Sequence, residues 1–529
     1  MDQTGAPGES GGRGPGRRRV LGLAAATFGS WSLGAAPTRA AAGAGAGRAV
    51  PRLPAGGALD VQAENALPGS PDWRIRRRGP ARAIEGFADR VSVRPGELLG
   101  VRVSTTSASY AVRAYRMGWY GGARARLVWQ SAPLPGVLQP PAVLDLETRT
   151  ARAAWRVTTR IDTSGWPEGC YLLRLDTQDG KAQRFVPVTV RSAFGAGRTV
   201  IMNSVATWQA YNRWGGADLY RGATGKNGSR SLRVTFDRPY ENRHGAGQFL
   251  PYEAPLIALA ESLGLPLAYT TGADVARCPV VLMGAAAMVS LGHDEYWSPE
   301  QRRHVTRARD SGTNLAVLGA NCCYRRIRFE ASDVGPDRVV VCYKGDYAKD
   351  PGFQRGSPPT HDFRRAPAAD PESALLGVLY DGYPVDAPYV VSHPEHWLLA
   401  GTGARAGDSY PRLVGVEFDR VNPAHPMPRP VEILAHSPVV CKGRPSYADT
   451  AYLSLPSGAG IFATGTMRWV EALDVGAPGG AKPSHGLDAR TGHFTRTVTA
   501  NLLRAFAQGP AGRARPARDN LAAHYGAPT

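Results

Sequence analysis

The sequence predicts two kinds of folded domain in one chain, an all-β domain followed by an α/β domain. The chain has 529 residues, which is too long for a single hydrophobic core, and its 43% hydrophobic and 20% charged residues are ordinary for a soluble globular protein. Short alternating segments separated by Pro- and Gly-bearing turns fill residues 76–193, whereas strand-like and helix-like segments alternate over residues 194–510. We therefore expect an immunoglobulin-like β-sandwich, then a doubly wound, mostly parallel α/β domain of the glutamine-amidotransferase-like or Rossmann-like type.

The first 45 residues have the pattern of an export signal. Arg17, Arg18 and Arg19 precede a short, weakly apolar stretch that reaches about Ala36, and the small residues 40–42 offer a cleavage site. Paired arginines before such a stretch are typical of the twin-arginine pathway, so we expect an extracellular or cell-wall-associated protein. The alternative is an uncleaved anchor, but an apolar stretch of about 15 residues is short for a membrane span.

The mature chain is expected to begin with a flexible linker over residues 46–75, because this segment is rich in Ala, Gly and Pro. The sandwich should follow over residues 76–193, since this region contains no convincing helical period. Its clearest expected strands are 91–93, 99–103, 110–115, 153–157 and 169–175.

The α/β domain is expected over residues 194–510, with a loose tail at residues 511–529. Ser298 and Pro299 have the residue types of an N-cap and a first helical turn, which predicts a helix from there to about residue 311. Two other helices are expected at 252–263 and 495–506, and strands at 199–202, 266–269, 280–283, 288–291, 314–318, 413–418 and 460–464.

Charge and cysteine content exclude several classes of function. The net charge of +19 comes almost entirely from arginines that are scattered through both domains, and no nucleic-acid-binding motif accompanies them, so we expect no nucleic-acid partner. No apolar run after residue 45 is long enough to cross a membrane. The six cysteines lack zinc-type spacing, and their pairing cannot be read from the sequence.

Polar side chains follow two expected strands at the point where each strand ends. His293, Asp294 and Glu295 follow the strand at 288–291, and Asn321 follows the strand at 314–318. Ligands of open α/β sheets gather beyond the carboxyl ends of the strands, so these side chains should converge. In extended backbone His293 and Glu295 point to one side and Asp294 to the other. A proton-transferring His beside a carboxylate indicates an enzyme, although a helix-capping turn with an ordinary ion pair is the structural alternative.

Several ordered motifs resemble the N,N-dimethylformamidase large (beta) subunit family. The resemblance covers roughly residues 85–508, and the motifs that carry it are 115–122, 208–212 followed by Gly215 and Gly216, 292–298, 319–321, 415–419, and 463–465 with Trp469. It implies a linear-amide hydrolase and, in the family, a separate small subunit; a homo-oligomer is the other possibility for this chain.

The resemblance also implies one mononuclear iron, as Fe³⁺, held by two tyrosine phenolates and one glutamate. By position Glu295 is the carboxylate ligand, Tyr211 the first phenolate and Tyr252 the second, with Tyr220 and Tyr240 as competitors for the last role. His293 and Asn321 match catalytic groups, and a further catalytic glutamate is assigned to Glu417 in preference to Glu395, Glu432 or Glu471.

This donor set is chemically coherent. Hard anionic oxygens suit a trivalent cation, and three protein ligands leave positions open for water and for a small-molecule amide. His293 or Glu417 would move the proton, and Asn321 would donate a hydrogen bond to the developing oxyanion. Two other interpretations remain: a metal-free hydrolase with Cys322 as the nucleophile, and a non-enzymatic surface or carbohydrate-binding protein.

Overall fold

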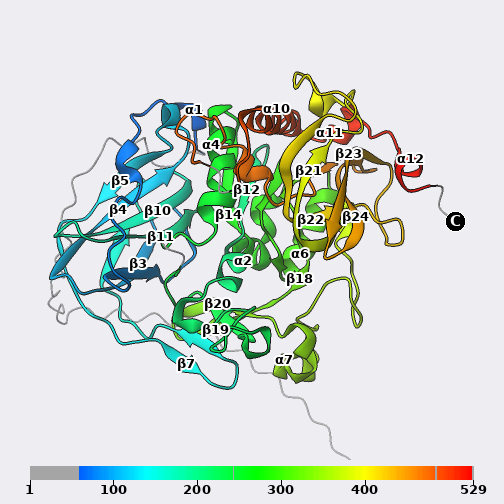
Figure 1. Ribbon diagram of the computed structural model, residues 1–529. Coiled ribbons are helices and arrows are strands. Elements are labelled where there is room, and N and C mark those ends of the chain that lie inside the picture. The colour runs from blue at the N-terminus through cyan, green and yellow to red at the C-terminus, as the bar shows by residue number, and fades with distance from the viewer. Residues whose placement is uncertain (1–58, 242–243, 483–484, 527–529) are drawn as a thin grey trace, which may run out of the picture. The chain divides into compact units, whose positions relative to one another are not determined.

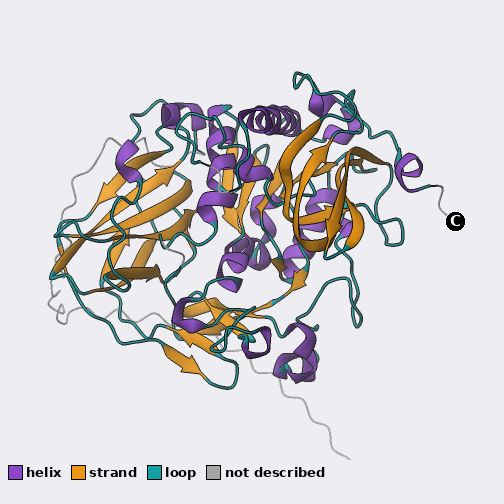
Figure 2. Ribbon diagram, in the orientation of Figure 1, coloured by secondary structure: helices purple, strands orange, loops and turns teal. Residues whose placement is uncertain are grey.

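Residues 59–241, 244–482 and 485–526 are described by the computed structural model of the protein (Figure 1). The predicted export signal and the linker up to residue 58 lie outside this part of the chain. Within it, the protein is a mixed α/β protein dominated by β-sheet (Figure 2). The expected combination of α and β structure is therefore confirmed, while the division into two domains and the immunoglobulin-like and doubly wound assignments stay predictions.

Two antiparallel-rich sheets form the β-rich N-terminal part. Alternate side chains of both sheets, such as Val101 and Leu173, enter one shared hydrophobic core, which is why these strands pack face to face. The first sheet has the order β1 (Ile84–Ala88), β3 (Leu98–Thr105), β9 (Thr159–Asp162); the second has the order β2 (Ser92–Val93), β11 (Gln183–Val190), β10 (Gly169–Thr177), β4 (Ser109–Met117), β5 (Ala125–Gln130), with β6 (Leu134–Pro135) paired to β4.

A seven-stranded sheet is the centre of the remaining chain. Its first five strands are parallel to one another, and the last two are antiparallel to their neighbours. In spatial order they are β14 (Leu267–Thr271), β12 (Thr199–Asn203), β15 (Ala287–Gly292), β17 (Asn314–Gly319), β25 (Gly460–Ala463), β24 (Arg444–Ser454) and β23 (Val431–Cys441).

Both faces of the parallel part of this sheet are buried, because its five parallel strands are mostly apolar. Val289 and Leu291 of β15 enter one hydrophobic cluster, whereas Met288 enters another. The first cluster includes side chains of α4 (Ala254–Ser262), α9 (Trp469–Ala472) and α10 (Ala489–Phe506), and the second includes side chains of α5 (Gly272–Arg277), α6 (Pro299–Asp310) and α8 (Ser373–Leu376).

Smaller elements surround the carboxyl ends of the parallel strands. They include the buried helices α2 (Val205–Ala210) and α3 (Phe249–Tyr252), the short pair β16 (Tyr296–Trp297) and β18 (Arg325–Arg326), the long hairpin-like pair β21 (Leu379–Val390) and β22 (Ser409–Arg420), and the sheet β13 (Arg233–Thr235), β20 (Gly335–Val341), β19 (Arg328–Ser332). The remaining elements are β7 (Val143–Asp145), β8 (Thr150–Arg152) and α7 (Pro351–Gln354).

A buried ion pair joins the β-rich part to the α/β part. Arg116 of β4 contacts Glu261 of α4 at 2.6 Å, and neither side chain is exposed to solvent. The hydroxyls of Tyr120 and Tyr269 complete the network by bonding Arg116 and Glu261 respectively. Each buried charge therefore has a partner across the contact, as burial of charge requires.

Both ends of the described chain are more ordered than predicted. Residues 61–65 form α1 (Val61–Asn65), whose Glu64 is fully buried against Arg126, so the linker assignment for 46–75 is wrong over its described part. The predicted loose tail instead contains α11 (Ala511–Ala514) and α12 (Leu521–Tyr525), and Asn520 bonds the backbone of β23. At each end, a few polar side chains bind partners that are distant in the sequence. These contacts fix the position of a segment whose composition alone predicts no fixed structure.

Three predicted segments differ in detail. Residues 153–157 were expected to form a strand, but they lie in the connection between β8, which ends at Arg152, and β9, which begins at Thr159. Residues 280–283 were expected to form a strand but lie in a 3-10 turn, Pro279–Leu282, because Pro279 stands at its start. The last long helix begins at Ala489 rather than near residue 495, since the Asp488 carboxylate caps it by accepting from the Thr491 N–H. None of the described helices is both long enough and apolar enough to cross a membrane.

Candidate functional site

The turn after β15 presents His293 and Glu295 on one side. Gly292 has φ +49° in this turn, and a Cβ there would lie 2.5 Å from the Cβ of Tyr252, so only glycine fits. The predicted alternation is confirmed, because Asp294 points the other way and accepts a hydrogen bond from Ser290 at 2.9 Å. His293 and Glu295 are both buried and both line one cavity.

Asn321 reaches the same cavity from the end of β17. The expected pairing of β15 with β17 is confirmed, with Gly292 opposite Gly319. Asn321 has φ +59°, a conformation that asparagine tolerates better than most residues, and its N–H donates to Asp419 at 2.7 Å. Its side-chain Nδ2 donates to Glu417 Oε2 at 2.8 Å, whereas its buried Oδ1 has no hydrogen-bond partner among the described residues.

Two tyrosines enter the site from one folded-back segment. Tyr211 ends α2, and a turn through Gly215 and Gly216, both with positive φ, reverses the chain. The Leu219 N–H donates to the Ala210 carbonyl at 3.0 Å, which places Tyr220 beside Tyr211 with ring centroids 4.6 Å apart.

Three oxygen-bearing side chains converge at the floor of the site. The Tyr211 hydroxyl donates to Glu295 Oε2 at 2.7 Å, and the Tyr220 hydroxyl also lies 2.7 Å from Glu295. The two hydroxyl oxygens are 2.9 Å apart. Three potential anionic donors therefore lie within hydrogen-bond distance of one another.

Tyr252 is not part of this cluster. It lines the same cavity, and its ring centroid is 6.2 Å from that of His293, but among the described residues its hydroxyl makes no hydrogen bond to Glu295. The geometry thus places Tyr220, the competitor named from the sequence, where the second phenol was expected. The assignment of Tyr252 rested on the match of its motif, residues 249–253, to the family.

Two basic side chains contact the cluster, Arg325 and Lys344; burial, with the charge of Arg325, lowers the pKa of Lys344 to about 7, so that only Arg325 is fully charged at neutral pH. Arg325 Nε donates to Glu295 Oε1 at 3.2 Å, and Lys344 Nζ lies 3.4 Å from the centre of the Tyr220 ring while donating to the Leu219 carbonyl. Burial alone would raise the pKa of Glu295, but the hydrogen bond from His293 and the charge of Arg325 outweigh it and hold that pKa well below its usual range. Glu295 is therefore a carboxylate at neutral pH.

The two phenols are neutral in the absence of a cation. Burial, reinforced by the Glu295 charge, raises the pKa of Tyr211 and that of Tyr220 well above the usual value for a phenol. Any ion that binds here must therefore displace two protons.

His293 links the oxygen cluster to the second carboxylate. Its Nδ1 lies 3.2 Å from Gln248 Oε1, and its Nε2 lies 3.5 Å from Glu295 and 3.6 Å from Glu417. Burial lowers the pKa of His293, but the two carboxylates overcome this and raise it above the usual value. Burial also raises the pKa of Glu417, although the nearby His293 opposes the rise. The pair is arranged for proton transfer near neutrality.

A cavity of about 630 Å³ opens above these groups. It lies at the carboxyl ends of β15 and β17, where ligands of α/β sheets bind. Its lining includes all six residues assigned from the sequence: Tyr211, Tyr252, His293, Glu295, Asn321 and Glu417. The alternatives Glu395, Glu432 and Glu471 are not part of it.

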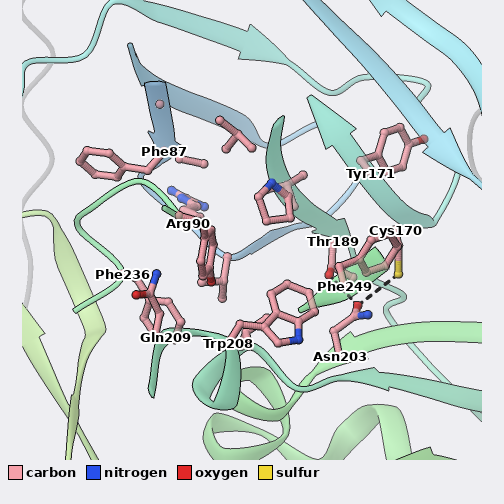
Figure 3. Close-up of a pocket in the computed structure, with 18 of the residues that line it drawn as sticks. Phe87, Arg90, Cys170, Tyr171, Thr189, Asn203, Trp208, Gln209, Phe236 and Phe249 are labelled. Carbon is pink, nitrogen blue, oxygen red and sulfur yellow. Dashed lines mark hydrogen bonds between the residues drawn. The ribbon is translucent and has the colours of Figure 1, made fainter. Parts of the chain in front are cut away.

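A second hollow lies behind α2, at its contact with the β-rich part. There Trp208 and Gln209 of α2 face Phe87 and Arg90 (Figure 3). Its volume of about 30 Å³ is that of a single water, and it contains none of the assigned site residues. This hollow belongs to the packing that holds α2, and through it Tyr211, in place.

The oxygen cluster fits a small, hard cation. Its two phenol oxygens and one carboxylate lie 2.7–2.9 Å from one another and would become three hard, anionic oxygen donors once the phenols lose their protons. The residues that would hold the ion are Tyr211, Tyr220 and Glu295. Among the described residues, no group of three His, Cys, Asp or Glu side chains is arranged to hold a metal, so any centre here depends on phenolates.

Cys322 does not have the environment of a nucleophile. Its side chain is buried, and its Sγ lies 3.7 Å from Ser290 Oγ. Burial and the nearby Asp294 and Asp419 raise the pKa of its thiol well above the usual range. Because the thiolate is the reactive form, these surroundings argue against a cysteine hydrolase.

Sequence reasoning missed three residues of the site. Arg325, Lys344 and Gln248 were not assigned to the site from the sequence. Their signals were weak but present: Lys344 is one of few lysines in an arginine-rich chain, and Gln248 directly precedes the motif that contains Tyr252.

The site combines a buried imidazole–carboxylate pair with two converging phenols, in a cavity at the carboxyl ends of parallel strands. This arrangement is typical of the active sites of α/β enzymes. The family is shown by comparison: the model of the N,N-dimethylformamidase beta subunit-like, C-terminal family matches residues 111–484, and the chain belongs to this family. A search of curated proteins finds no match.

Proposed function

We propose that the protein is a metal-dependent amidohydrolase that cleaves a linear C–N amide bond. The observation that carries this proposal is the convergence of the Tyr211, Tyr220 and Glu295 oxygens beside His293 and Glu417 in a member of a dimethylformamidase-like family. The metal is Fe³⁺, because two phenolates and a carboxylate form a hard, highly anionic donor set. When bound, the ion would polarise the amide carbonyl and acidify water.

The protein's own residues would manage the protons and the substrate. His293, oriented through Nδ1 by Gln248, would take the proton of the attacking water at Nε2 and pass it to the leaving amine nitrogen. Glu417 faces His293 and would stabilise the imidazolium that forms between these two events. The reaction consumes the amide and water and releases a carboxylic acid and an amine.

Asn321 would position both partners of this step. One N–H of its amide group holds Glu417, and the other would donate to the developing oxyanion. Its Oδ1, which has no hydrogen-bond partner in the part of the chain that the structure describes, offers an acceptor to a substrate N–H or to water. The left-handed backbone of Asn321, held by Asp419, fixes this amide at the strand end.

The decisive experiment is metal analysis of the purified chain with its reaction. We expect one iron per chain, a visible phenolate-to-iron absorption band and hydrolysis of N,N-dimethylformamide or a related amide. Tyr211→Phe and Glu295→Gln should lose iron and activity together, whereas Cys322→Ala should keep both. A colourless, metal-free protein that hydrolyses no amide would refute the proposal and favour a binding protein.

Three further parts of the proposal concern the whole chain. Residues 1–45 act as a twin-arginine signal, which exports the folded, metal-loaded protein. A separate small subunit assembles with the chain, as the beta-subunit name of the family suggests. The β-rich part is an immunoglobulin-like sandwich and the seven-stranded sheet is doubly wound.

A further inference from the structure

The cavity is much larger than a simple dialkyl formamide needs. Its volume of about 630 Å³ falls in the ~300–1,000 Å³ range of sites for drug-sized ligands. A neighbouring hollow of about 410 Å³ shares Tyr211, Arg213 and Gln248 with it. A small substrate would leave most of this space to water, so the shape indicates a longer molecule.

The charges of the cavity are distributed unevenly. Arg325, near the reacting groups, is in ion pairs with Glu295 and Asp362. Arg213 and Arg221 line the same cavity with exposed side chains, and neither has an ion-pair partner within 4 Å among residues 59–241, 244–482 and 485–526. The exposed part of the lining therefore carries two arginines that no described carboxylate contacts as an ion pair.

The nearest acidic side chain in the lining does not neutralise them. Asp218 is buried, and its Oδ1 accepts the backbone N–H groups of Tyr220 and Arg221 at 2.7 and 2.6 Å. Its charge acts instead on the buried Arg238. The other acids of the lining, Glu295 and Glu417, contact His293 and Asn321 at the reacting end.

The rest of the lining suits an apolar or aromatic body. It includes Tyr324, Tyr380, Tyr383, Val416 and Met467. The Tyr324 and Tyr380 rings are 5.1 Å apart, and Tyr383 is 48% exposed. Such a surface packs against hydrocarbon or ring carbons and offers no formal charge.

We propose that the physiological substrate is a carboxylate-bearing amide, whose carboxylate is bound by Arg213 and Arg221 while its amide lies over the Tyr211–Glu295–His293 groups and its apolar body packs on the tyrosine-lined wall. This inference rests on the proposed amidohydrolase function and adds the substrate class to it. Arginine is the side chain best suited to a carboxylate, because its planar guanidinium can donate two parallel hydrogen bonds.

The test compares matched pairs of formamides in the iron-loaded full chain. Each pair consists of an ω-formamido carboxylate (formamidoacetate, 4-formamidobutanoate or 6-formamidohexanoate) and the alcohol with the same carbon chain. We expect kcat/KM for the carboxylate of the best-fitting length to exceed that of its alcohol by about tenfold or more. The preference should shrink in 0.5 M NaCl, because the Debye length there is roughly 3–8 Å and salt screens the exposed arginines.

The arginines are tested by the double variant Arg213→Gln, Arg221→Gln. Its kcat/KM for the preferred carboxylate should fall about tenfold further than its kcat/KM for the alcohol. The control Arg444→Gln removes an exposed arginine of β24 and should leave the preference unchanged. Equal turnover of carboxylate and alcohol by the unaltered chain, or equal losses in the double variant, would overturn the inference while leaving the amidohydrolase proposal intact.

Binding measured by calorimetry separates the two proposals when turnover fails. If the chain hydrolyses none of these amides but binds 6-formamidohexanoate more tightly than the alcohol, in a manner lost in the double variant, the anion site stands and the amidohydrolase proposal falls. If it hydrolyses none and shows no preference in binding, both fall.

Discussion

At the scale of single residues, Glu295 organises the site. It accepts hydrogen bonds from two phenols and from Arg325, and it lies close to His293. A carboxylate with this many donors stays ionised although it is buried. It therefore supplies the fixed negative charge around which the phenols, and the cation that would displace their protons, are arranged.

The first prediction distinguishes the two tyrosines considered for the second phenolate. Tyr220→Phe should lower iron affinity by roughly 100-fold or more and weaken the visible band, because it removes a ligand oxygen. Loss of a residue that only hydrogen-bonds to a metal ligand typically lowers affinity by about 10–100-fold, and loss of a ligand should have at least that effect. Tyr252→Phe should retain iron and the band. Iron titration followed by absorbance measures both; loss of iron only in Tyr252→Phe would reverse the assignment.

The second prediction concerns Asp419, which holds the Asn321 N–H. Burial, with Glu372 and Glu417 nearby, raises the pKa of Asp419 to about 8, against about 3.9 in an unfolded chain. Between those values the folded protein binds a proton that the unfolded chain does not, so this group's contribution to stability falls as pH rises from about 4 to 8.

Asp419→Asn removes this titration but keeps an acceptor for Asn321. The difference in melting temperature, variant minus natural protein, should therefore be larger at pH 8 than at pH 5. The corresponding change in the free energy of unfolding should be at least ~1 kcal/mol. Asp333→Asn, at an exposed ion pair, is the control measured at the same pH values. A difference for Asp419→Asn that is the same at pH 5 and at pH 8 would mean that Asp419 is ionised throughout.

At the scale of elements, residues at strand ends could be predicted and residues brought in by turns could not. His293, Glu295 and Asn321 follow apolar strands, and neighbouring parallel strands deliver their carboxyl ends to one edge. Tyr220 reaches the site only because the Gly215–Gly216 turn pairs Leu219 with Ala210. The periodicity of the sequence does not reveal that backbone pairing. The motif at residues 249–253 offered Tyr252 as the candidate instead.

The same limit applies to the fold. The parallel core strands could be predicted because side chains on both of their faces are apolar. The prediction of a strand at residues 280–283 was wrong, because a short apolar run fits a buried turn equally well. The contact between the two parts depends on Arg116 and Glu261, which are 145 residues apart, and a single sequence cannot reveal such a pair.

The third prediction tests that contact. Arg116→Ala should lower the free energy of unfolding by about 3–5 kcal/mol, because it leaves Glu261 charged and buried without its cation. Arg113→Ala on the same strand should lose only about 1 kcal/mol or less, since Asp176 keeps its bonds from Arg174 and Gln183. Urea denaturation measures both, and similar values for the two variants would refute a special role for the buried pair.

At the scale of the whole described chain, the N-terminal helix belongs to the folded body. Glu64 of α1 accepts from Arg126 and from the Tyr120 hydroxyl, and Asn65 bonds Glu261 and the backbone N–H groups of residues 119 and 120. These contacts connect α1 to the β-rich part and to α4 at the same place as the Arg116–Glu261 pair. Composition alone identified this segment as a linker, because its anchoring depends on two polar side chains.

The fourth prediction follows for truncated chains. Removal of residues 1–45, the predicted export signal, should leave the melting temperature unchanged, because a signal that is cleaved after export is not part of the folded protein. Removal of residues 1–75 deletes α1 and the buried Trp73, and leaves Arg126 without Glu64. The loss should exceed ~3 kcal/mol, since an unpaired buried charge alone has about that effect.

Glu64→Gln in the chain that lacks residues 1–45 isolates the charge from the rest of the segment. Gln can still accept from Tyr120 but cannot neutralise Arg126, so its melting temperature should lie between those of the two truncations. If the chains that lack residues 1–45 and 1–75 had the same melting temperature, α1 would contribute nothing to the stability of the folded protein. Its order would then have to come from its own sequence, and the Ala-, Gly- and Pro-rich composition of residues 46–75 does not favour that.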